Sequence, residues 1–169
     1  MDLLDGIFTR RSIRKYTKEE ISNEHIEVIL KAGMYAPSAS NQQPWHFIVI
    51  SDRKLLDTIK DVHPYAKMLV EAQLAILVCG DINLELSKDY WVVDCSASTQ
   101  NMLLAAHGLG LGAVWLGIHP RVERKNEIRK IFNLPENIQP ASLISIGYPD
   151  ENKEMPDRYK PERIHYNAW

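Results

Sequence analysis

The sequence predicts a single domain in which helices and strands alternate. Its 169 residues are enough to bury a substantial core but few for two independent domains. Four short apolar runs have the length and residue types of strands, and helical patterns of apolar residues separate them. No internal repeat or low-complexity segment divides the chain. We therefore expect residues 1–169 to form one layered domain.

The first elements are predicted from apolar spacing and from residues typical of helix ends. Apolar residues at helical spacing indicate a short helix over residues 2–9. Ser22 is typical of the residue that begins a helix, and Pro37 cannot continue one, so a second helix is expected between them. The amide-rich segment 37–44 is a predicted loop, and residues 45–50 are a predicted strand.

The later elements continue the same alternation. The run 74–79 is apolar throughout, which is typical of a strand buried on both faces. The segment 88–107 is small and apolar on most sides, so we expect this helix in the core. The predicted elements after the first strand are helices over 53–60 and 64–71, a strand over 74–79, a helix over 88–107, a strand over 113–116, a helix over 121–132 and a strand over 141–148.

Charge and cysteine usage exclude several classes of protein. The formal net charge is −2 and both signs are mixed along the chain, so no broad basic surface indicates nucleic acid or an anionic membrane as the main partner. No apolar run approaches the roughly 20 residues that span a bilayer, and no signal peptide is recognisable, so a cytoplasmic protein is expected. Cys79 and Cys95 lack metal-site spacing and are expected to be buried free thiols.

A cluster of cations lies near the start of the chain. Arg10, Arg11 and Arg14 accompany Ser12 within five consecutive residues. Guanidinium groups match the geometry of phosphate oxygens, and a serine hydroxyl can donate or accept beside them. The cluster therefore suits a phosphate next to a polar planar ring, although a solvated basic face at a helix end has the same composition.

Two other patterns favour structural roles over catalytic ones. Gly108, Gly110 and Gly112 resemble part of a dinucleotide-binding fingerprint, but here a helix precedes the glycines and a strand follows them, which is the reverse of that motif. A helix end and a tight turn are the favoured interpretation. The histidines lack zinc-site spacing and the serines lack a nucleophile elbow, so neither a metal site nor a nucleophilic residue is predicted.

Four segments in register resemble the FMN-dependent nitroreductase family, and in particular its smaller members. They are Arg10 to Tyr16, the loop from Pro37 to Trp45, Gly108 to Gly117, and the tail from Arg158 to Trp169. The resemblance implies an α+β fold, a three-layer sandwich with a central, mostly antiparallel sheet flanked by helices. It also implies an intertwined homodimer with two FMN molecules at the subunit interface. Because Ile164, Tyr166 and Trp169 are too apolar for a free tail, we expect residues 150–169 to dock on the partner subunit.

The resemblance also implies the residues that bind FMN. They are Arg10, Arg11, Ser12, Arg14, Pro37, Ser38, Ser40, Asn41, Gln43, Lys67, Val114, Trp115, Leu116, Gly117 and Arg158. In the family, the first arginine and the serine hold the phosphate and ribityl end, and a cation at Arg14 lies near the pyrimidine edge, where it favours the reduced flavin. Lys67 resembles a second cation at that edge, although an exposed helix lysine is the alternative.

The remaining implied contacts come from the loop, a strand end and the tail. The loop residues are expected to reach the flavin from the second subunit, with an ordinary polar turn as the alternative. The strand end Val114 to Gly117 is expected to run along one flavin face; it keeps the glycine but lacks the acid of the Pro-x-Glu-Gly sequence in many larger relatives. Arg158 resembles the phosphate ligand of the tail, and Lys160 and Arg163 are competing choices.

The function implied is hydride transfer from NADH or NADPH through FMN to nitroaromatic, quinone or similar flat acceptors, by a ping-pong mechanism. No side chain is expected to act as a catalytic acid, base or metal ligand, because the flavin performs the redox step. Tyr65, Tyr90 and Trp91 are candidates for an aromatic wall beside the ring, with core packing as the alternative. Other functions left open are reductive dehalogenation, flavin destruction, and FMN binding without catalysis.

Overall fold

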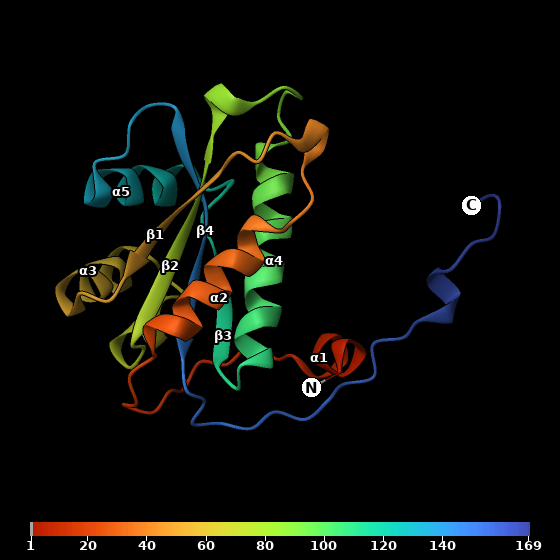
Figure 1. Ribbon diagram of the computed structural model, residues 1–169, viewed down its shortest axis with the longest axis horizontal. Coiled ribbons are helices and arrows are strands. Elements are labelled where there is room, and N and C mark those ends of the chain that lie inside the picture. The colour runs from red at the N-terminus through yellow and green to blue at the C-terminus, as the bar shows by residue number, and fades with distance from the viewer. Residues whose placement is uncertain (1) are drawn as a thin grey trace.

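The computed structural model describes residues 2–169 (Figure 1). Its helices are α1 (Leu3–Thr9), α2 (Asn23–Met34), α3 (Arg53–Val62), α4 (Trp91–Gly108) and α5 (Val122–Phe132). Its strands are β1 (Trp45–Ile50), β2 (Leu74–Asp81), β3 (Gly112–Gly117) and β4 (Ile138–Gly147). Short 3-10 turns lie at Ala39–Asn41, Lys67–Val70, Ile82–Leu84 and Pro161–Arg163. Among the helices described, none is both long enough and apolar enough to cross a membrane.

The four strands form one antiparallel sheet in the order β1-β2-β4-β3. Helices α3 and α5 cover one face of the sheet, and α2 and α4 cover the other (Figure 1). The predicted α+β class and the three-layer sandwich are therefore confirmed. Seven of the eight residues of β2 are buried, as expected for a strand covered on both faces.

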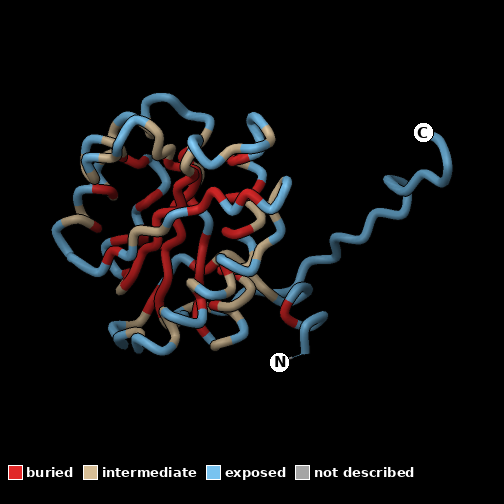
Figure 2. The backbone as a smooth tube through the Cα atoms, turned by 45° about the horizontal axis from the view of Figure 1, so that its top comes forward, coloured by how far each residue is buried: buried red, intermediate tan, exposed pale blue. Residues whose placement is uncertain are grey.

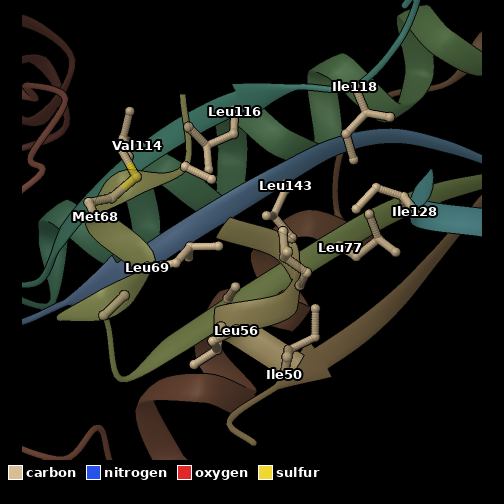
Figure 3. Packing of buried hydrophobic residues seen from close by; sticks show 14 of the residues in the cluster. Ile50, Leu56, Met68, Leu69, Leu77, Val114, Leu116, Ile118, Ile128 and Leu143 are labelled. Carbon is tan, nitrogen blue, oxygen red and sulfur yellow. The ribbon is translucent and has the colours of Figure 1, made fainter. Parts of the chain in front are cut away.

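Each face of the sheet has its own hydrophobic core. The cluster under α3 and α5 includes Leu56, Leu77, Val114, Leu116 and Leu143 (Figure 3). The cluster under α2 and α4 includes Ile29, Ile76, Met102, Leu103 and Ile144. Buried residues concentrate in the sheet and the inner sides of the helices (Figure 2). The predicted central position of α4 is confirmed, since eight of its residues are buried.

The two cysteines belong to different cores. Cys79 lies in the cluster under α3 and α5, and Cys95 lies in the cluster under α2 and α4. Both are buried free thiols, as predicted. Burial raises the pKa of Cys79 to about 12 and also raises the pKa of Cys95.

Helix ends follow the sequence signals. The side chain of Ser22 accepts a hydrogen bond from the His25 N–H at 3.2 Å, so it begins α2 as predicted. Helix α4 ends at Gly108, and Gly110 follows with a φ of 79°, which is the left-handed conformation that glycine adopts freely. The Leu111 N–H then donates to the Ala106 carbonyl at 2.9 Å. The glycine-rich segment is therefore a helix end and a turn, as predicted.

The α-helix expected over residues 64–71 is wrong. Only a 3-10 turn forms, at Lys67–Val70. The N–H groups of Leu69 and Glu71 donate to carbonyls three positions back, at Ala66 and Met68, which is the 3-10 pattern. The guanidinium of Arg53 in α3 donates to the carbonyls of Leu69, Val70 and Ala72 and so fixes the end of this turn. This contact joins residues sixteen to nineteen positions apart, so local spacing does not reveal it.

The opening segment and the start of the tail lie side by side at one end of the sheet. Ser12 forms a parallel bridge with Ala113, and Tyr16 forms an antiparallel bridge with Pro149. The Asp150 N–H donates to the Lys15 carbonyl at 2.9 Å. The tail continues along the opening segment and past α1, and only its last part extends away from the body of the chain (Figures 1 and 2).

A pair of glycines allows the opening segment to approach the sheet. Gly112 and Gly147 are opposite each other in the β3–β4 register. A Cβ at Gly112 would lie 2.6 Å from Ile13 Cγ2, and one at Gly147 would lie 2.8 Å from Tyr16 Cδ1. The Tyr16 hydroxyl is held by the carbonyls of Ile13 at 2.7 Å and Ser145 at 3.2 Å, so its ring cannot easily move away. Ile13 and Tyr16 therefore pack directly on the backbone.

We expect Gly147→Ala to lower the free energy of unfolding by about 1–3 kcal/mol, because the added methyl overlaps the Tyr16 ring. Urea denaturation of the variant and the parent protein measures this difference. Gly108→Ala is the matched control, since a Cβ there would meet no atom within 4 Å. Equal losses in the two variants would contradict the packing explanation.

Candidate functional site

The free edge of β3 is the backbone part of the candidate site. The Ile13 N–H donates to the Ala113 carbonyl at 3.0 Å, so Ala113 directs its backbone groups away from β4. Because alternate residues of an antiparallel strand face the same edge, Trp115 and Gly117 do the same. A Cβ at Gly117 would have no atom within 4 Å, so space is open beside the end of this strand.

The side chains of β3 separate onto the two faces of the sheet. Val114 and Leu116 are buried in the core under α3 and α5. Trp115 points to the opposite face and is 38% exposed. Of the four predicted residues on this strand, only Trp115 and the backbone of Gly117 are thus available to a ligand from this chain.

Arg10 and Arg158 come together although 148 positions separate them in the sequence. They line a cavity of about 640 Å³ between α1 and the tail, together with Arg11 and Tyr159. Burial and repulsion by Arg11 and Arg158 lower the pKa of Arg10. Within residues 2–169, neither Arg10 nor Arg158 has an ion-pair partner. Two guanidinium groups that share a cavity in this way have the donor chemistry that phosphate and carboxylate groups match.

One carboxylate also lines this cavity. Asp157 precedes Arg158, and its Oδ1 accepts a hydrogen bond from the Tyr159 N–H at 3.1 Å. Its charge is therefore partly compensated within the tail. The cavity retains a net positive charge from its three arginines.

Arg11 has a different environment from Arg10. Its guanidinium donates to the carbonyls of Phe8 at 2.6 Å, Arg10 at 2.5 Å and Glu154 at 3.2 Å. These contacts join the end of α1 to the tail. Arg11 therefore lines the same cavity as Arg10 with its donors directed at the backbone.

The other residues of the opening motif face the start of the tail. The Ser12 carbonyl accepts from Lys153 Nζ at 2.7 Å, and the Arg14 N–H donates to Glu151 Oε1 at 2.5 Å. The Arg14 side chain is exposed. Lys67 is also exposed, and the residue after it, Met68, belongs to the same buried cluster as Val114 (Figure 3).

The loop Pro37 to Pro44 has an unusual backbone. Ser40, Asn41 and Gln43 have φ values of 50°, 52° and 45°, a region that residues other than glycine seldom adopt. Its hydroxyl and amide groups bond one another: Ser38 Oγ accepts from the Gln43 N–H at 3.0 Å, and Gln43 Nε2 donates to Asn41 Oδ1 at 2.9 Å. Pro37, Ser40, Asn41 and Gln43 are exposed, and Ser38 is half-buried.

This loop and the arginine cluster lie at opposite ends of α4 (Figure 1). Asp94, near the start of α4, accepts a hydrogen bond from the loop, whereas His107, near its end, contacts Thr9 Oγ1 at 2.9 Å. Thirteen residues separate Asp94 from His107, which is about 20 Å along a helix. A single chain therefore does not bring the predicted loop residues and the predicted phosphate residues together.

A second cavity, of about 730 Å³, lies between α5 and the segment before β2. Tyr65 lines it together with Arg121 and Arg124, and the Arg124 guanidinium lies 5.2 Å from the Tyr65 ring centre. Arg124 also donates to the Gly117 carbonyl at 2.8 Å, so this cavity adjoins the end of β3. Trp91, in contrast, packs in the core under α4, as the alternative interpretation proposed.

His63 supports the same carbonyl. It is 1% exposed, and its Nε2 lies 3.0 Å from the Gly117 carbonyl while its Nδ1 accepts from the Tyr65 N–H at 3.3 Å. This pattern requires a neutral ring that is protonated at Nε2. Burial lowers the pKa of His63 below 6.5; the Gly117 carbonyl opposes this shift and Arg124 adds to it.

The sequence matches a model of the nitroreductase family over residues 7–78 and 63–148. The chain belongs to the nitroreductase family. It is 50% identical, over all of its length and 88% of the relative, to a protein of Methanothermobacter thermautotrophicus provisionally named NADH dehydrogenase/NAD(P)H nitroreductase. The same provisional name is carried by a Parabacteroides distasonis protein whose crystal structure superposes with a TM-score of 0.95 and 42% identity, covering 99% of this chain and 98% of that one.

A third relative links this fold to a cofactor. A nitroreductase, also provisionally named, from Desulfovibrio desulfuricans was crystallised in complex with FMN. It superposes on this chain with a TM-score of 0.87 and 34% identity, and the match covers 100% of this chain and 98% of the other. The matched ranges of the family model end at residue 148, so the tail lies outside them.

Sequence reasoning missed two buried polar residues of this nitroreductase. Asp94 is 3% exposed and bonds to the loop, and Gln42, which is 8% exposed, belongs to the loop and bonds to Asp94. The available signal for Asp94 was an acid in an otherwise small and apolar helix. Gln42 sits between two residues that were predicted as contacts, and only its burial distinguishes it from them.

We expect the free energy of unfolding to decrease as the pH falls below 6.5, because the unfolded chain then protonates His63 at its ordinary pKa while the folded chain resists protonation. Burial also lowers the pKa values of His107 and His119, which adds to the decrease. Urea denaturation between about pH 7.5 and about pH 5 measures the slope. His63→Gln keeps a neutral donor, and it should reduce the slope of the free energy of unfolding against pH. An unchanged slope in this variant would show that His63 is not the residue responsible.

Proposed function

We propose that this nitroreductase is an FMN-dependent oxidoreductase that uses NADH or NADPH to reduce flat acceptors such as nitroaromatic compounds and quinones. The observation that carries the proposal is the joining of Arg10 and Arg158 in one cavity, next to the segment that Ser12 bridges to β3, the strand that ends at Gly117. The first feature fits a phosphate and the second fits a planar ring. The family membership and the names of the relatives agree with this activity.

The donor set fits FMN at both of its ends. Arg10 and Arg158 would hold the phosphate, because guanidinium groups bind phosphate oxygens in pairs. Ser12, two residues after Arg10, would serve the ribityl chain, and the exposed cations Arg14 and Lys67 would face the pyrimidine edge. Val114 to Gly117 would lie along the ring, since Gly117 adds no side chain to that space. When bound, FMN supplies the chemistry of hydride acceptance and electron donation.

The polypeptide contributes orientation and electrostatics. Arg14 and Lys67 would place positive charge near the negative charge of a reduced flavin, which would favour reduction. His63 and Arg124 both bond to the Gly117 carbonyl, so they hold in place the strand end along which the ring would lie. Arg11 would act indirectly, by holding Arg10 and the tail in place. No side chain is required as a nucleophile or metal ligand.

We propose further that the active form is a homodimer. The loop and the arginine cluster are about 20 Å apart along α4, so Pro37, Ser38, Ser40, Asn41 and Gln43 would complete the site of the other subunit. The exposed tail supports this arrangement, because Tyr159, Tyr166 and Trp169 are 70%, 83% and 101% exposed in the single chain. A partner surface would bury these side chains. The free thiols agree with a cytoplasmic location, which we keep as part of the proposal.

We expect the purified protein to be yellow, and its visible absorbance to disappear when NADH or NADPH is added without oxygen. Adding a nitroaromatic compound or a quinone should then restore the absorbance, because one open face serves donor and acceptor in turn. An anaerobic spectrophotometric titration follows both steps. A yellow protein that neither nicotinamide bleaches would indicate FMN binding without catalysis, and would overturn the reductase proposal.

The same preparation tests the dimer. Light scattering is expected to give twice the chain mass of 19.4 kDa. A monomer that binds FMN with full affinity would contradict the contribution of the loop from a second subunit.

We expect Arg10→Gln and Arg158→Gln each to weaken FMN binding by roughly tenfold or more, because each removes a charge-assisted contact to the phosphate. Fluorescence titration of the apoprotein with FMN measures the dissociation constant. Lys160→Gln and Arg163→Gln are the matched controls, since neither residue lines the cavity with Arg10. A larger loss of FMN affinity in either control than in Arg158→Gln would show that the control residue, and not Arg158, is the phosphate contact of the tail.

A further inference from the structure

Asp94 is a buried residue whose two carboxylate oxygens both accept hydrogen bonds from the loop. It lies in the first turns of α4 and is 3% exposed. Its Oδ1 accepts from the Ala39 N–H at 2.9 Å, and its Oδ2 accepts from Gln42 Nε2 at 2.6 Å. A buried carboxylate is costly unless both oxygens are hydrogen-bonded. Here both are bonded, and both donors belong to the loop that connects α2 to β1.

Gln42 extends this contact to a third segment. Its amide group donates to Asp94, and its Oε1 accepts from the backbone N–H groups of Leu86 and Ser87 at 2.8 and 2.9 Å. The hydroxyls of Ser40 and Ser87 lie 3.0 Å apart. The loop is therefore joined to α4 and to the segment before α4 through one side chain, which donates to Asp94 and accepts from two backbone N–H groups.

The anchored residues alternate with the exposed ones. Ala39 and Gln42 bond to Asp94, whereas Ser40, Asn41 and Gln43 project outward from left-handed backbone positions. Serine and glutamine do not favour that conformation, so contacts elsewhere must maintain it. The bonds from Ala39 and Gln42 to Asp94 lie on either side of Ser40 and Asn41, and the bond from the Gln43 N–H to Ser38 Oγ holds the third strained residue.

We propose that Asp94 is a positioning residue for the cofactor site: acting through Gln42 and the Ala39 N–H, it fixes the loop whose side chains contact FMN in the neighbouring subunit. This inference rests on the proposed function. Asp94 touches neither FMN nor substrate. Its role is to keep the loop in one conformation before the ligand binds, so that binding does not have to order the loop.

A reciprocal exchange of the two side chains tests the proposal. Asp94→Asn places an amide where Gln42 also presents an amide, and Gln42→Glu places a carboxylate opposite a carboxylate. Each single change therefore leaves one contact with two donors or two acceptors. In the double variant D94N/Q42E, the amide created at position 94 donates to the carboxylate created at position 42. That carboxylate can still accept from the N–H groups of Leu86 and Ser87.

Each single variant is expected to raise the dissociation constant for FMN by roughly tenfold or more, and the double variant to return it to within about threefold of the parent value. Fluorescence titration of each apoprotein measures the constants. Arg129→Gln is the control for a general loss of stability, because Arg129 lies in α5, on the other face of the sheet, and joins that helix to the carbonyls of Pro135 and Ile138 at the start of β4. It should lower the melting temperature without changing FMN affinity.

The outcomes separate the inference from the proposed function. If the parent binds FMN and the single variants bind it equally well, Asp94 has no positioning role and the proposed function stands. If the double variant is as weak as the single variants, the pairing of Asp94 with Gln42 is not the cause. If the parent does not bind FMN, the proposed function fails and the inference fails with it.

If a single variant does not fold, its FMN affinity cannot be measured, and the double variant alone then tests the proposal. A folded double variant with near-parental affinity supports the proposal, because the exchange then restores both the fold and the loop. A double variant that is unfolded, or folded without affinity for FMN, overturns it.

Discussion

The packing of the opening segment on the paired ends of β3 and β4 determines most of the candidate site. Gly112 and Gly147 leave the backbone uncovered there, and Ile13 and Tyr16 occupy the space that side chains would fill. This contact directs Arg10 toward the tail and aligns the chain along the edge of β3. Without it, the cations would be attached to a flexible terminus and would have no defined relation to the strand.

Helix α4 separates the two parts of the site that one chain contributes. Its beginning anchors the loop through Asp94, and its end contacts α1 through His107. Because the helix is rigid, the distance between the two parts is set within each subunit. Two copies arranged about a symmetry axis would therefore build two equivalent sites at once, each with an arginine cluster from one chain and a loop from the other.

The sequence predicted the elements well because their signals are local. Apolar periodicity, the Ser22 cap and the glycines after α4 each act within a few residues, and all were confirmed. At residues 64–71 a 3-10 turn forms in place of the expected helix, and the contacts that fix its end come from Arg53 in α3. The site followed the same rule: the cation motif was visible in the sequence, but the Asp94–Gln42 contact spans 52 positions and has no local signature.

The location of the two thiols has a consequence for an electron-transfer protein. Cys79 and Cys95 lie in the cores on opposite faces of the sheet, and burial raises both pKa values. Thiolates, which react with peroxide and disulfides, are therefore scarce in the folded chain. A flavoenzyme in air generates oxidants close to its own polypeptide, and these two sulfur atoms are shielded from them by layers of aliphatic side chains. Oxidation of either thiol would therefore require the core around it to open first.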